Sequence, residues 1–330
     1  MADTDVPDDR RIKVLYIAGY GRSGSTLLDI LLSQQESIFG AGEISALTRH
    51  VWSNNELCAC GKAAKQCAVW SQVLDSWVRR SHADPDTDVD TYRVEQHRAE
   101  TLLSPSRILR DASFVRYRRE TTALLASIAE RTSCSVIVDS SKLPGRGLAL
   151  AAMREVDLTV LHLVRDGRGV AWSLAKPFKR DVARGLQKEI RRKSWLRTAI
   201  RWSVVNLMTE LLCWRVGRSR SIRIRYEDMV HDPARIASTI HALLHGKLAQ
   251  PLDPDLAPRH QIAGNRLRMQ RSIRLKPDER WRSEMPTPAQ LAFSLLCAPL
   301  LLRYGYPFLN RRAPHRSIVT ASSDVEVRDA

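Results

Sequence analysis

The chain has 330 residues, of which 44% are hydrophobic, and it carries 52 Lys and Arg against 36 Asp and Glu, a formal net charge of +16. This composition is typical of a globular protein and excludes collagen-like, low-complexity and disordered chains. The positive charge favours a polyanionic partner, and nucleic acid, an anionic membrane surface and a small phosphorylated ligand all meet that description.

Neither the ends of the chain nor its apolar runs carry a targeting or membrane signal. Residues 1–10 lack the basic-then-apolar pattern of a signal peptide, so we expect a disordered lead there and a polar, disordered tail at 311–330. A single domain is expected from 11 to 310. The longest apolar run, Leu291–Leu302, is shorter than the ~20 residues needed to cross a bilayer, which predicts a soluble, cytoplasmic protein without a transmembrane segment.

The first predicted elements are a strand, a glycine turn and a helix. Ile12–Ala18 is an apolar run rich in β-branched residues, typical of a strand buried on both faces of a parallel sheet. The turn Gly19–Gly24 follows, and Ser25–Ser33 has leucines at helical spacing. Similar short strands are predicted at Ser135–Asp139, Leu158–Val164 and Ile222–Tyr226. Their alternation with helical patterns predicts an α/β fold with a P-loop-like central parallel sheet flanked by helices.

Three later segments complete the predicted organisation. Asp88–Arg131 is charged and is expected to form helices on the outside of the sheet, while Leu196–Val216 has an amphipathic helical pattern. Pro251–Arg282 is basic and rich in proline, without an apolar period, which predicts a loop that is ordered by itself or by a ligand.

The glycine turn has the form of a phosphate-binding loop. Gly19–Thr26 fits GxxxxG followed by Ser and Thr, but Ser25 stands where a nucleotide triphosphate P-loop has its lysine. The amides of residues 22–26 can still point into one concavity at a helix N-terminus, and Arg22 supplies a cation. A tight turn that needs glycine only for packing is the alternative interpretation.

Polar residues also follow two later predicted strands. Arg165 comes directly after Leu158–Val164, at the sheet edge where open α/β folds bind ligands, and Ser173 lies eight residues further on. Arg225–Asp228 closes another strand with polar groups at the same edge.

These residues together resemble the sulfotransferases that use 3′-phosphoadenosine 5′-phosphosulfate (PAPS), especially the bacterial members and the tyrosylprotein and carbohydrate branches. Gly19–Leu28 is similar to the family's 5′-phosphosulfate loop, in which an Arg or Lys takes the place of Arg22. Arg165 and Ser173 are similar to its 3′-phosphate motif, and the resemblance implies that Tyr226 approaches the nucleotide.

Two further stretches, Val138–Lys142 and Gly264–Trp281, are similar to bacterial members of the family. The resemblance implies PAPS as the donor, a small-molecule or glycan acceptor, and no metal in the reaction. It implies donor contacts from Arg22, Ser23, Gly24, Ser25, Thr26, Arg165, Ser173, Tyr226, Gly264, Asn265 and Arg266.

Candidates for the catalytic groups are Glu43, Arg22 and Lys142. Glu43 follows the strand-like run Ile38–Ala41 in a Gly-Glu context, and the resemblance implies that such a Glu is the base; a solvated loop residue is the alternative. Arg22 faces the transferred group. Lys142 is expected to steady the sulfuryl oxygens or the bridging oxygen, unless it only caps a helix. His50 and His162 are weaker candidates for the base, and His162 in a buried strand is expected to be a core histidine.

A cysteine cluster adds a separate question. Cys58, Cys60 and Cys67 offer three thiolates, but structural zinc wants four ligands, and neither His50 nor His82 has a recognised spacing. Zinc, a redox-dependent disulfide and free packed thiols all remain open. The other cysteines are expected to be ordinary buried residues: Cys134, Cys213 and Cys297.

Two other functions compete with sulfuryl transfer. A P-loop small-molecule kinase is disfavoured by Ser25 and by the lack of a convincing metal-binding Asp, for which Asp139 is the nearest candidate. A nucleic-acid-binding protein would fit the basic stretch Arg165–Arg225, but no recognition motif is readable, so no nucleic-acid partner is expected. The oligomeric state and the acceptor are not indicated, and the acceptor pocket is expected from Thr48–Arg131 and Phe178–Trp202.

Overall fold

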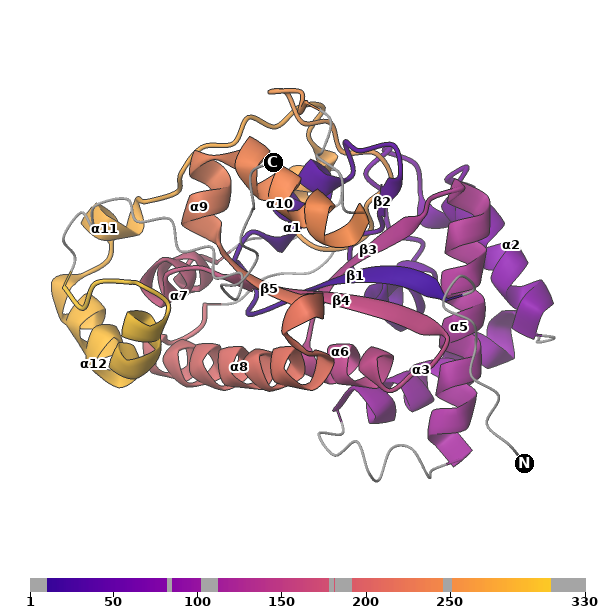
Figure 1. Cartoon of the computed structure of the whole chain (residues 1–330), viewed down its shortest axis with the longest axis horizontal. Coiled ribbons are helices and arrows are strands. Elements are labelled where there is room, and N and C mark those ends of the chain that lie inside the picture. Colours follow the sequence, from indigo (N-terminus) through magenta and orange to yellow (C-terminus); the bar gives the residue numbers. More distant parts are fainter. Residues whose placement is uncertain are drawn as a thin grey trace, which may run out of the picture.

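One sheet of parallel strands lies at the centre of this computed structural model, which describes residues 11–81, 85–101, 112–177, 181, 192–245 and 251–309 (Figure 1). The sheet has the order β2-β3-β1-β4-β5, and every pairing in it is parallel. The predicted α/β fold with a P-loop-like central sheet flanked by helices is therefore confirmed. The strands are β1 (Ile12–Ala18), β2 (Ile38–Gly40), β3 (Val136–Lys142), β4 (Val156–Val164) and β5 (Ser221–Arg225).

Some of the expectations fall outside the described residues. These are the lead at 1–10, the tail at 311–330, His82 and part of Phe178–Trp202. Among the described helices, none is long and apolar enough to cross a membrane.

The two faces of the sheet are covered because the strand residues alternate between them. Leu15 and Ile17 of β1 pack into one apolar cluster, while Val14 and Tyr16 pack into another, as the period of two in a strand requires. In Figure 1, α1 (Ser25–Leu32), α9 (Tyr226–His231) and α10 (Pro233–His245) lie above the strands, and α6 (Pro144–Ala151) and α8 (Trp195–Val216) lie below them.

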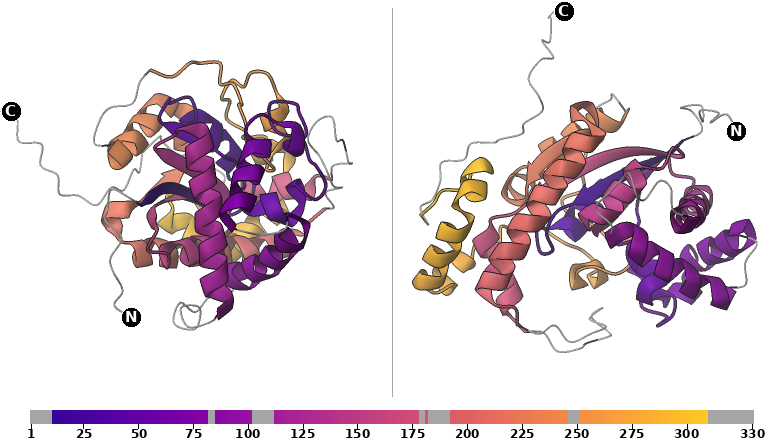
Figure 2. Two further views of the ribbon diagram at one scale, coloured as in Figure 1. Left: turned by 90° about the vertical axis from the view of Figure 1, so that its right-hand side faces the viewer. Right: turned by 90° about the horizontal axis from the view of Figure 1, so that it is seen from below.

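Further helices extend the molecule at both ends. Figure 2 shows α2 (Trp70–Ser81) and α12 (Thr287–Arg303) at opposite ends. The charged stretch that was expected to lie outside the sheet forms α3 (Pro85–Thr101) and α5 (Ala112–Thr132), and α5 packs on β3 and β1. Near α12, the short helices α7 (Gly167–Ala175) and α11 (Trp281–Glu284) share a third apolar cluster with α8.

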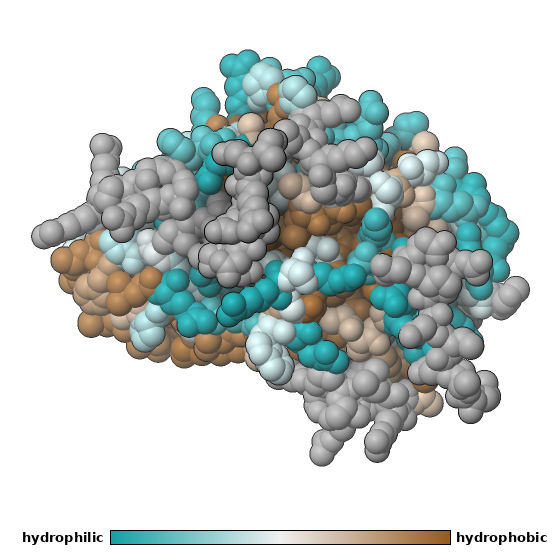
Figure 3. Space-filling view, in the orientation of Figure 1, coloured by the Kyte–Doolittle hydropathy of each residue, from teal (hydrophilic) through white to brown (hydrophobic). Residues whose placement is uncertain are grey.

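Helices α8 and α12 also expose apolar side chains. Figure 3 shows them as a brown area along the lower left side of the molecule. They are Leu196, Ile200, Val204, Leu207, Leu211 and Trp214 on α8, and Leu291, Leu295, Leu296 and Leu302 on α12.

The segment Pro251–Arg282 is mostly irregular, as predicted. It contains a 3-10 turn at Arg266–Met269 and an isolated antiparallel bridge between Leu256 and Ile273. Several strand boundaries differ from the predictions by one to three residues. Strand β3 continues to Lys142, whose positive φ of 72° ends the strand, and Tyr226 begins α9 instead of ending β5.

Candidate functional site

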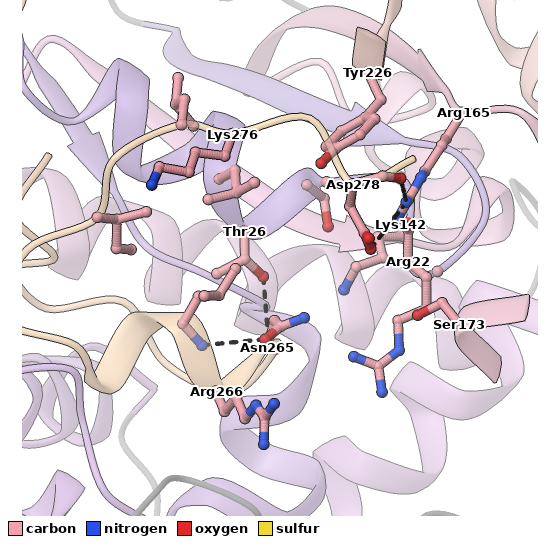
Figure 4. Close-up of a pocket in the computed structure, with 18 of the residues that line it drawn as sticks. Arg22, Thr26, Lys142, Arg165, Ser173, Tyr226, Asn265, Arg266, Lys276 and Asp278 are labelled. Atoms are coloured by element: carbon pink, nitrogen blue, oxygen red, sulfur yellow. Dashed lines mark hydrogen bonds and ion pairs between the residues drawn. The ribbon is translucent and has the colours of Figure 1, made fainter. Parts of the chain in front are cut away.

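A cavity of about 610 Å³ lies where β1, β3, β4 and β5 end, because parallel strands bring their carboxyl ends to one edge of the sheet (Figure 4). The register aligns Ala18 of β1 with Lys142 of β3 and with His162 of β4. Almost all the site residues predicted from the sequence line this one cavity: Arg22, Gly24, Ser25, Thr26, Glu43, Lys142, Arg165, Ser173, Tyr226, Gly264, Asn265 and Arg266. Only Ser23 is not among its lining residues.

The loop between β1 and α1 needs its glycines for close approach and for backbone conformation. A Cβ at Gly19 would lie 2.4 Å from the carbonyl oxygen of Leu163, and one at Gly24 would lie 2.6 Å from Cδ2 of Tyr226. Gly24 also has a φ of 96°, in the left-handed region that other residues rarely adopt. These constraints bring the loop against the ends of β4 and β5.

The start of α1 is open to an anion. No side chain caps this helix, and its first turn holds no acidic residue. The amides of a helix's first turn lack partners within the helix and carry the positive end of its dipole. Next to them, Ser23 is 3% exposed, and its Oγ has no hydrogen-bond partner in the described part of the chain.

Arg165 forms the centre of a second group of residues. Its side chain is nearly buried, and its guanidinium carbon lies 4.5 Å from the centre of the Tyr226 ring. Its Nη1 donates to the carbonyl oxygen of Arg22 at 3.1 Å, and its Nη2 donates to the carbonyl oxygen of Asp278 at 2.8 Å. The Asp278 carboxylate is 3.2 Å from the same Nη2. Arg165 therefore ties the glycine loop to the irregular segment.

Ser173 and Tyr226 follow this arginine in sequence by 8 and 61 residues, and both line the same cavity. Ser173 is on α7, whose start is fixed by Asp166, since this side chain accepts a hydrogen bond from the amide of Arg168 at 2.9 Å. Burial raises the pKa of Tyr226, so its hydroxyl keeps its proton and remains a donor.

Glu43 and Lys142 form an ion pair at the cavity, between Oε1 and Nζ. Glu43 lies in the loop after β2, and its amide donates to the carbonyl oxygen of Ile262 at 3.0 Å. A Cβ at Gly264 would lie 3.1 Å from Glu43 Oε1, so glycine leaves room for the carboxylate. In Figure 4, the amide of Asn265 donates to Thr26 Oγ1 at 3.1 Å, which joins the irregular segment to α1.

Positive charge dominates the cavity. Burial lowers the pKa of Arg22, and the neighbouring Arg266 and Arg165 lower it further, as expected where cations gather. The sequence analysis missed several polar residues that line the cavity. They are Lys193, Gln270, Arg274, Lys276, Asp278 and Arg280. The only signal for most of them was the basic composition of Pro251–Arg282.

The expected acceptor segments contribute little to this cavity. Among the described residues, Thr48–Arg131 supplies no lining residue, and Phe178–Trp202 supplies Lys193. The two weaker base candidates also lie elsewhere. His50 Nδ1 is 2.8 Å from Glu56 Oε1, and the buried His162 is bonded to Asn206 at 3.0 Å. Burial lowers the pKa of His162 to about 4, so it is a neutral core histidine.

The cysteine cluster has a fourth member that the sequence analysis did not find. His260 lies beside Cys58, Cys60 and Cys67. The hydrogen bond between Cys58 and Cys67 lowers the pKa of the Cys67 thiol and raises that of Cys58. Of the three cysteines expected to be buried elsewhere, Cys297 is buried, whereas Cys134 and Cys213 are partly exposed.

Comparisons with known proteins give a matching family model and solved structures of similar fold. A family model described as "Sulfotransferase family" matches residues 15–248. The fold is similar to that of the sulfotransferase domain of the Synechococcus PCC 7002 olefin synthase, with a TM-score of 0.50 and 19% identity over 91% of this chain and 98% of that one. A sulfotransferase domain from the curacin biosynthetic pathway gives a TM-score of 0.49 and 16% identity over 90% and 99% of the two chains. No curated protein sequence matches this chain.

Proposed function

The chain belongs to the sulfotransferase family, and from this premise we propose that it transfers a sulfuryl group from PAPS to a hydroxyl group of a small-molecule or glycan acceptor. The observation that carries the proposal is the meeting of three distant sequence motifs at one cavity. Four residues of the glycine loop and the start of α1, the pair Arg165 and Ser173, and Tyr226 all line it; the four are Arg22, Gly24, Ser25 and Thr26. The glycine loop can bind one anionic group and Arg165 can bind another, which suits a nucleotide with phosphate groups at both ends.

The residues present fit such a donor. The uncapped start of α1 and the unpartnered Ser23 hydroxyl offer donors for the 5′-phosphosulfate, and Arg22 adds a positive charge. Arg165 and Ser173 would bind the 3′-phosphate. The nucleotide would be covered by Gly264, Asn265 and Arg266, which line the cavity. These residues follow Ile262, which is bonded to the loop after β2.

In the proposed reaction, Glu43 takes the proton of the acceptor hydroxyl as the hydroxyl oxygen attacks the sulfur. The bond between the sulfur and the phosphate oxygen breaks, and its electron pair leaves with 3′-phosphoadenosine 5′-phosphate (PAP). Lys142 and Arg22 stabilise the negative charge that develops on the bridging and sulfuryl oxygens. The ion pair with Lys142 holds the Glu43 side chain at the cavity, where its carboxylate would accept the proton.

The kinase alternative has less support. Asp139, the nearest candidate for a metal ligand, is fully buried and accepts hydrogen bonds from Arg146 Nε at 2.7 Å and from the Ser141 hydroxyl. Arg146 is in turn bonded to Glu100 at 2.6 Å. Asp139 thus belongs to a buried ion network and is not a lining residue of the cavity.

The proposal is tested by supplying PAPS, labelled in its sulfuryl group, with an extract of hydroxyl-bearing metabolites and no added Mg²⁺. We expect PAP release and products heavier by one sulfuryl group in mass spectrometry. Calorimetry should show much tighter binding of PAP than of ATP, because Arg165 and Ser173 would bind a 3′-phosphate that ATP lacks. Equal affinities, or Mg²⁺-dependent phosphoryl transfer from ATP, would overturn the proposal in favour of a kinase.

A further inference from the structure

Four side chains of the types that bind transition metals meet outside the cavity. The ligand atoms of Cys58, Cys60, Cys67 and His260 all lie within 4.8 Å of one another. The Cys67 sulfur is 3.6 Å from the Cys60 sulfur and 3.7 Å from the Cys58 sulfur. His260 Nδ1 is 3.3 Å from the Cys67 sulfur and 3.8 Å from the Cys58 sulfur.

These distances are those of a tetrahedron around a zinc ion. With Zn–S bonds of about 2.3 Å and a Zn–N bond of about 2.0–2.1 Å, the edges of a regular tetrahedron are about 3.8 Å between sulfurs and about 3.6 Å between sulfur and nitrogen. A disulfide would instead need its sulfurs about 2.05 Å apart. The observed sulfur–sulfur distances of 3.6 and 3.7 Å match the edges of a zinc tetrahedron and are far longer than a disulfide bond.

The backbone around the cluster holds the ligands in place. Cys58 and Cys60 lie in a tight turn, in which the amide of Gly61 donates to the Cys58 carbonyl at 3.0 Å, and Gly61 has a φ of 83°. The carbonyl oxygen of His260 accepts a hydrogen bond from Trp70 Nε1 at 2.6 Å. This bond holds the backbone of the residue that carries the imidazole.

We propose that Cys58, Cys60, Cys67 and His260 bind one zinc ion in a structural site. Three thiolates and one imidazole are a donor set that zinc prefers, and four protein ligands leave no position for a substrate or an activated water. The site goes beyond the proposed sulfuryl transfer, and its occupancy can be measured without any acceptor.

The site would join two segments that are far apart in sequence. The first segment, Cys58–Cys67, precedes α2. The second contains His260 and continues to Ile262, which pairs with Gly42. It then reaches the cavity at Gly264–Arg266. The amide of Ala59 also donates to the Gln261 carbonyl oxygen at 3.0 Å. Bound zinc would therefore hold the irregular segment that lines the cavity, and would stabilise the folded chain by the free energy of binding.

The test measures the metal content of the full chain, purified under reducing conditions without a metal-affinity step. Elemental analysis should find about one zinc ion per chain, as a single four-ligand site requires. Cys60→Ser should remove most of the zinc, and this variant should fold because the Cys60 side chain is exposed. His260→Ala should act in the same way. Cys134→Ser, a matched change at a cysteine outside the cluster, should keep the zinc.

A second measurement on the unmodified chain does not depend on how the variants fold. Zinc should protect the exposed Cys60 from alkylation, and removal of the metal by a chelator should make Cys60 reactive, while the reactivity of Cys134 stays the same. Cys58 and Cys67 are buried and do not serve as probes. Substitution of Co²⁺ should give the thiolate charge-transfer and ligand-field bands of a tetrahedral site.

Three outcomes would overturn the proposal. The first is a folded chain with less than about a tenth of a zinc ion after reconstitution with Zn²⁺, since structural sites bind it tightly. The second is a disulfide among the three cysteines in the protein as isolated under non-reducing conditions. The third is retention of zinc in folded Cys60→Ser and His260→Ala together.

Discussion

One wall of the cavity, here called the strand wall, consists of the lining residues between 21 and 26 together with Lys142, Arg165 and Tyr226, each of which follows or ends a strand of the sheet. The other, the segment wall, consists of the lining residues between 264 and 280, which belong to no strand. The strand wall is fixed by the pairing of β1 with β3 and β4, which is continuous with β4 and shifts its register with β3 between Tyr16 and Ala18. Its residues cannot move without disturbing the core of the protein.

The segment wall depends on a few single contacts. The amide of Ile262 donates to the Ala41 carbonyl at 3.2 Å, and two hydrogen bonds of 3.1 and 2.9 Å join Leu256 and Ile273. Asn265 bonds to Thr26, and Asp278 bonds to Arg165. Backbone pairing therefore holds the strand wall, whereas the segment wall is held by separate hydrogen bonds.

The largest effect is expected at Glu43, which pairs with Lys142 of the strand wall and lies beside Gly264 of the segment wall. Glu43→Gln keeps the size of the side chain but removes the proposed base, so turnover should fall by about 10²–10⁴-fold while PAP affinity hardly changes. Steady-state kinetics with an aliphatic hydroxyl acceptor and calorimetry with PAP measure the two quantities. Glu36→Gln, at an exposed position, is the control. Near-normal turnover of Glu43→Gln would mean that the base lies elsewhere.

The second-largest effect is expected at Arg165, which belongs to the strand wall. Arg165→Ala should weaken PAP binding by about 10- to 100-fold, because each charge-assisted hydrogen bond contributes ~1.5–3 kcal/mol. Calorimetry should also show that the preference for PAP over ATP becomes smaller. Arg79→Ala, at an exposed position on α2, should bind PAP normally. A uniform loss of affinity for PAP and ATP would show that Arg165 does not recognise the 3′-phosphate.

A third effect concerns Asp29 on α1, behind the strand wall, whose Oδ2 accepts a hydrogen bond from the amide of Gly42 at 3.0 Å. Burial raises the pKa of Asp29 to about 7, although the bonds to Gly42, Ser140 and Gln261 oppose this shift. Between pH ~4 and ~7 the folded chain holds a proton that the unfolded chain has released, so the free energy of unfolding should decrease as pH rises, by at most about 1.4 kcal/mol per pH unit.

Asp29→Asn should remove this decrease, because asparagine does not titrate. Denaturant unfolding followed across the same pH range measures the slope, and Asp75→Asn, at an exposed position, should leave it unchanged. Parallel pH profiles for the unmodified chain and for Asp29→Asn would exclude a raised Asp29 pKa.

The smallest effect is expected at Asp278 on the segment wall. Its carboxylate is partly exposed and pairs with Arg165, so a bound phosphate would compete with it. Asp278→Asn should tighten PAP binding by about two- to fivefold, in keeping with the energy of a partly exposed ion pair. The neighbouring carboxylate variant Glu279→Gln should bind PAP as the unmodified chain does. Weaker binding to Asp278→Asn would show that Asp278 helps to position Arg165.

The difference between the strand wall and the segment wall also explains which site residues could be predicted from the sequence. Strands carry a periodic pattern, and the residue after a parallel strand lies at a known sheet edge, so Arg22, Arg165 and Tyr226 could be placed from the sequence. Lys276, Asp278 and Arg280 lie in a segment without a period, where position depends on individual side-chain contacts.

The position of His260 in the cysteine cluster also could not be predicted from the sequence. It is 193 residues from Cys67. Such a contact becomes predictable only when the path of the whole chain is known, because the ligand spacings that identify zinc sites in sequences are local. The family resemblance supplied Glu43, which its local sequence alone would have left as one loop residue among many.

Strand β1 lies between two strands that are synthesised long after it. Both of its neighbours, β3 and β4, begin only at Val136 and Val156. A ribosome adds about 5–20 residues per second, so β1 emerges many seconds before its partners are complete. During that interval both edges of an apolar strand are unpaired, and such edges readily join other chains. Slower synthesis would prolong this exposure, whereas chaperones that cover apolar segments would raise the yield of native protein.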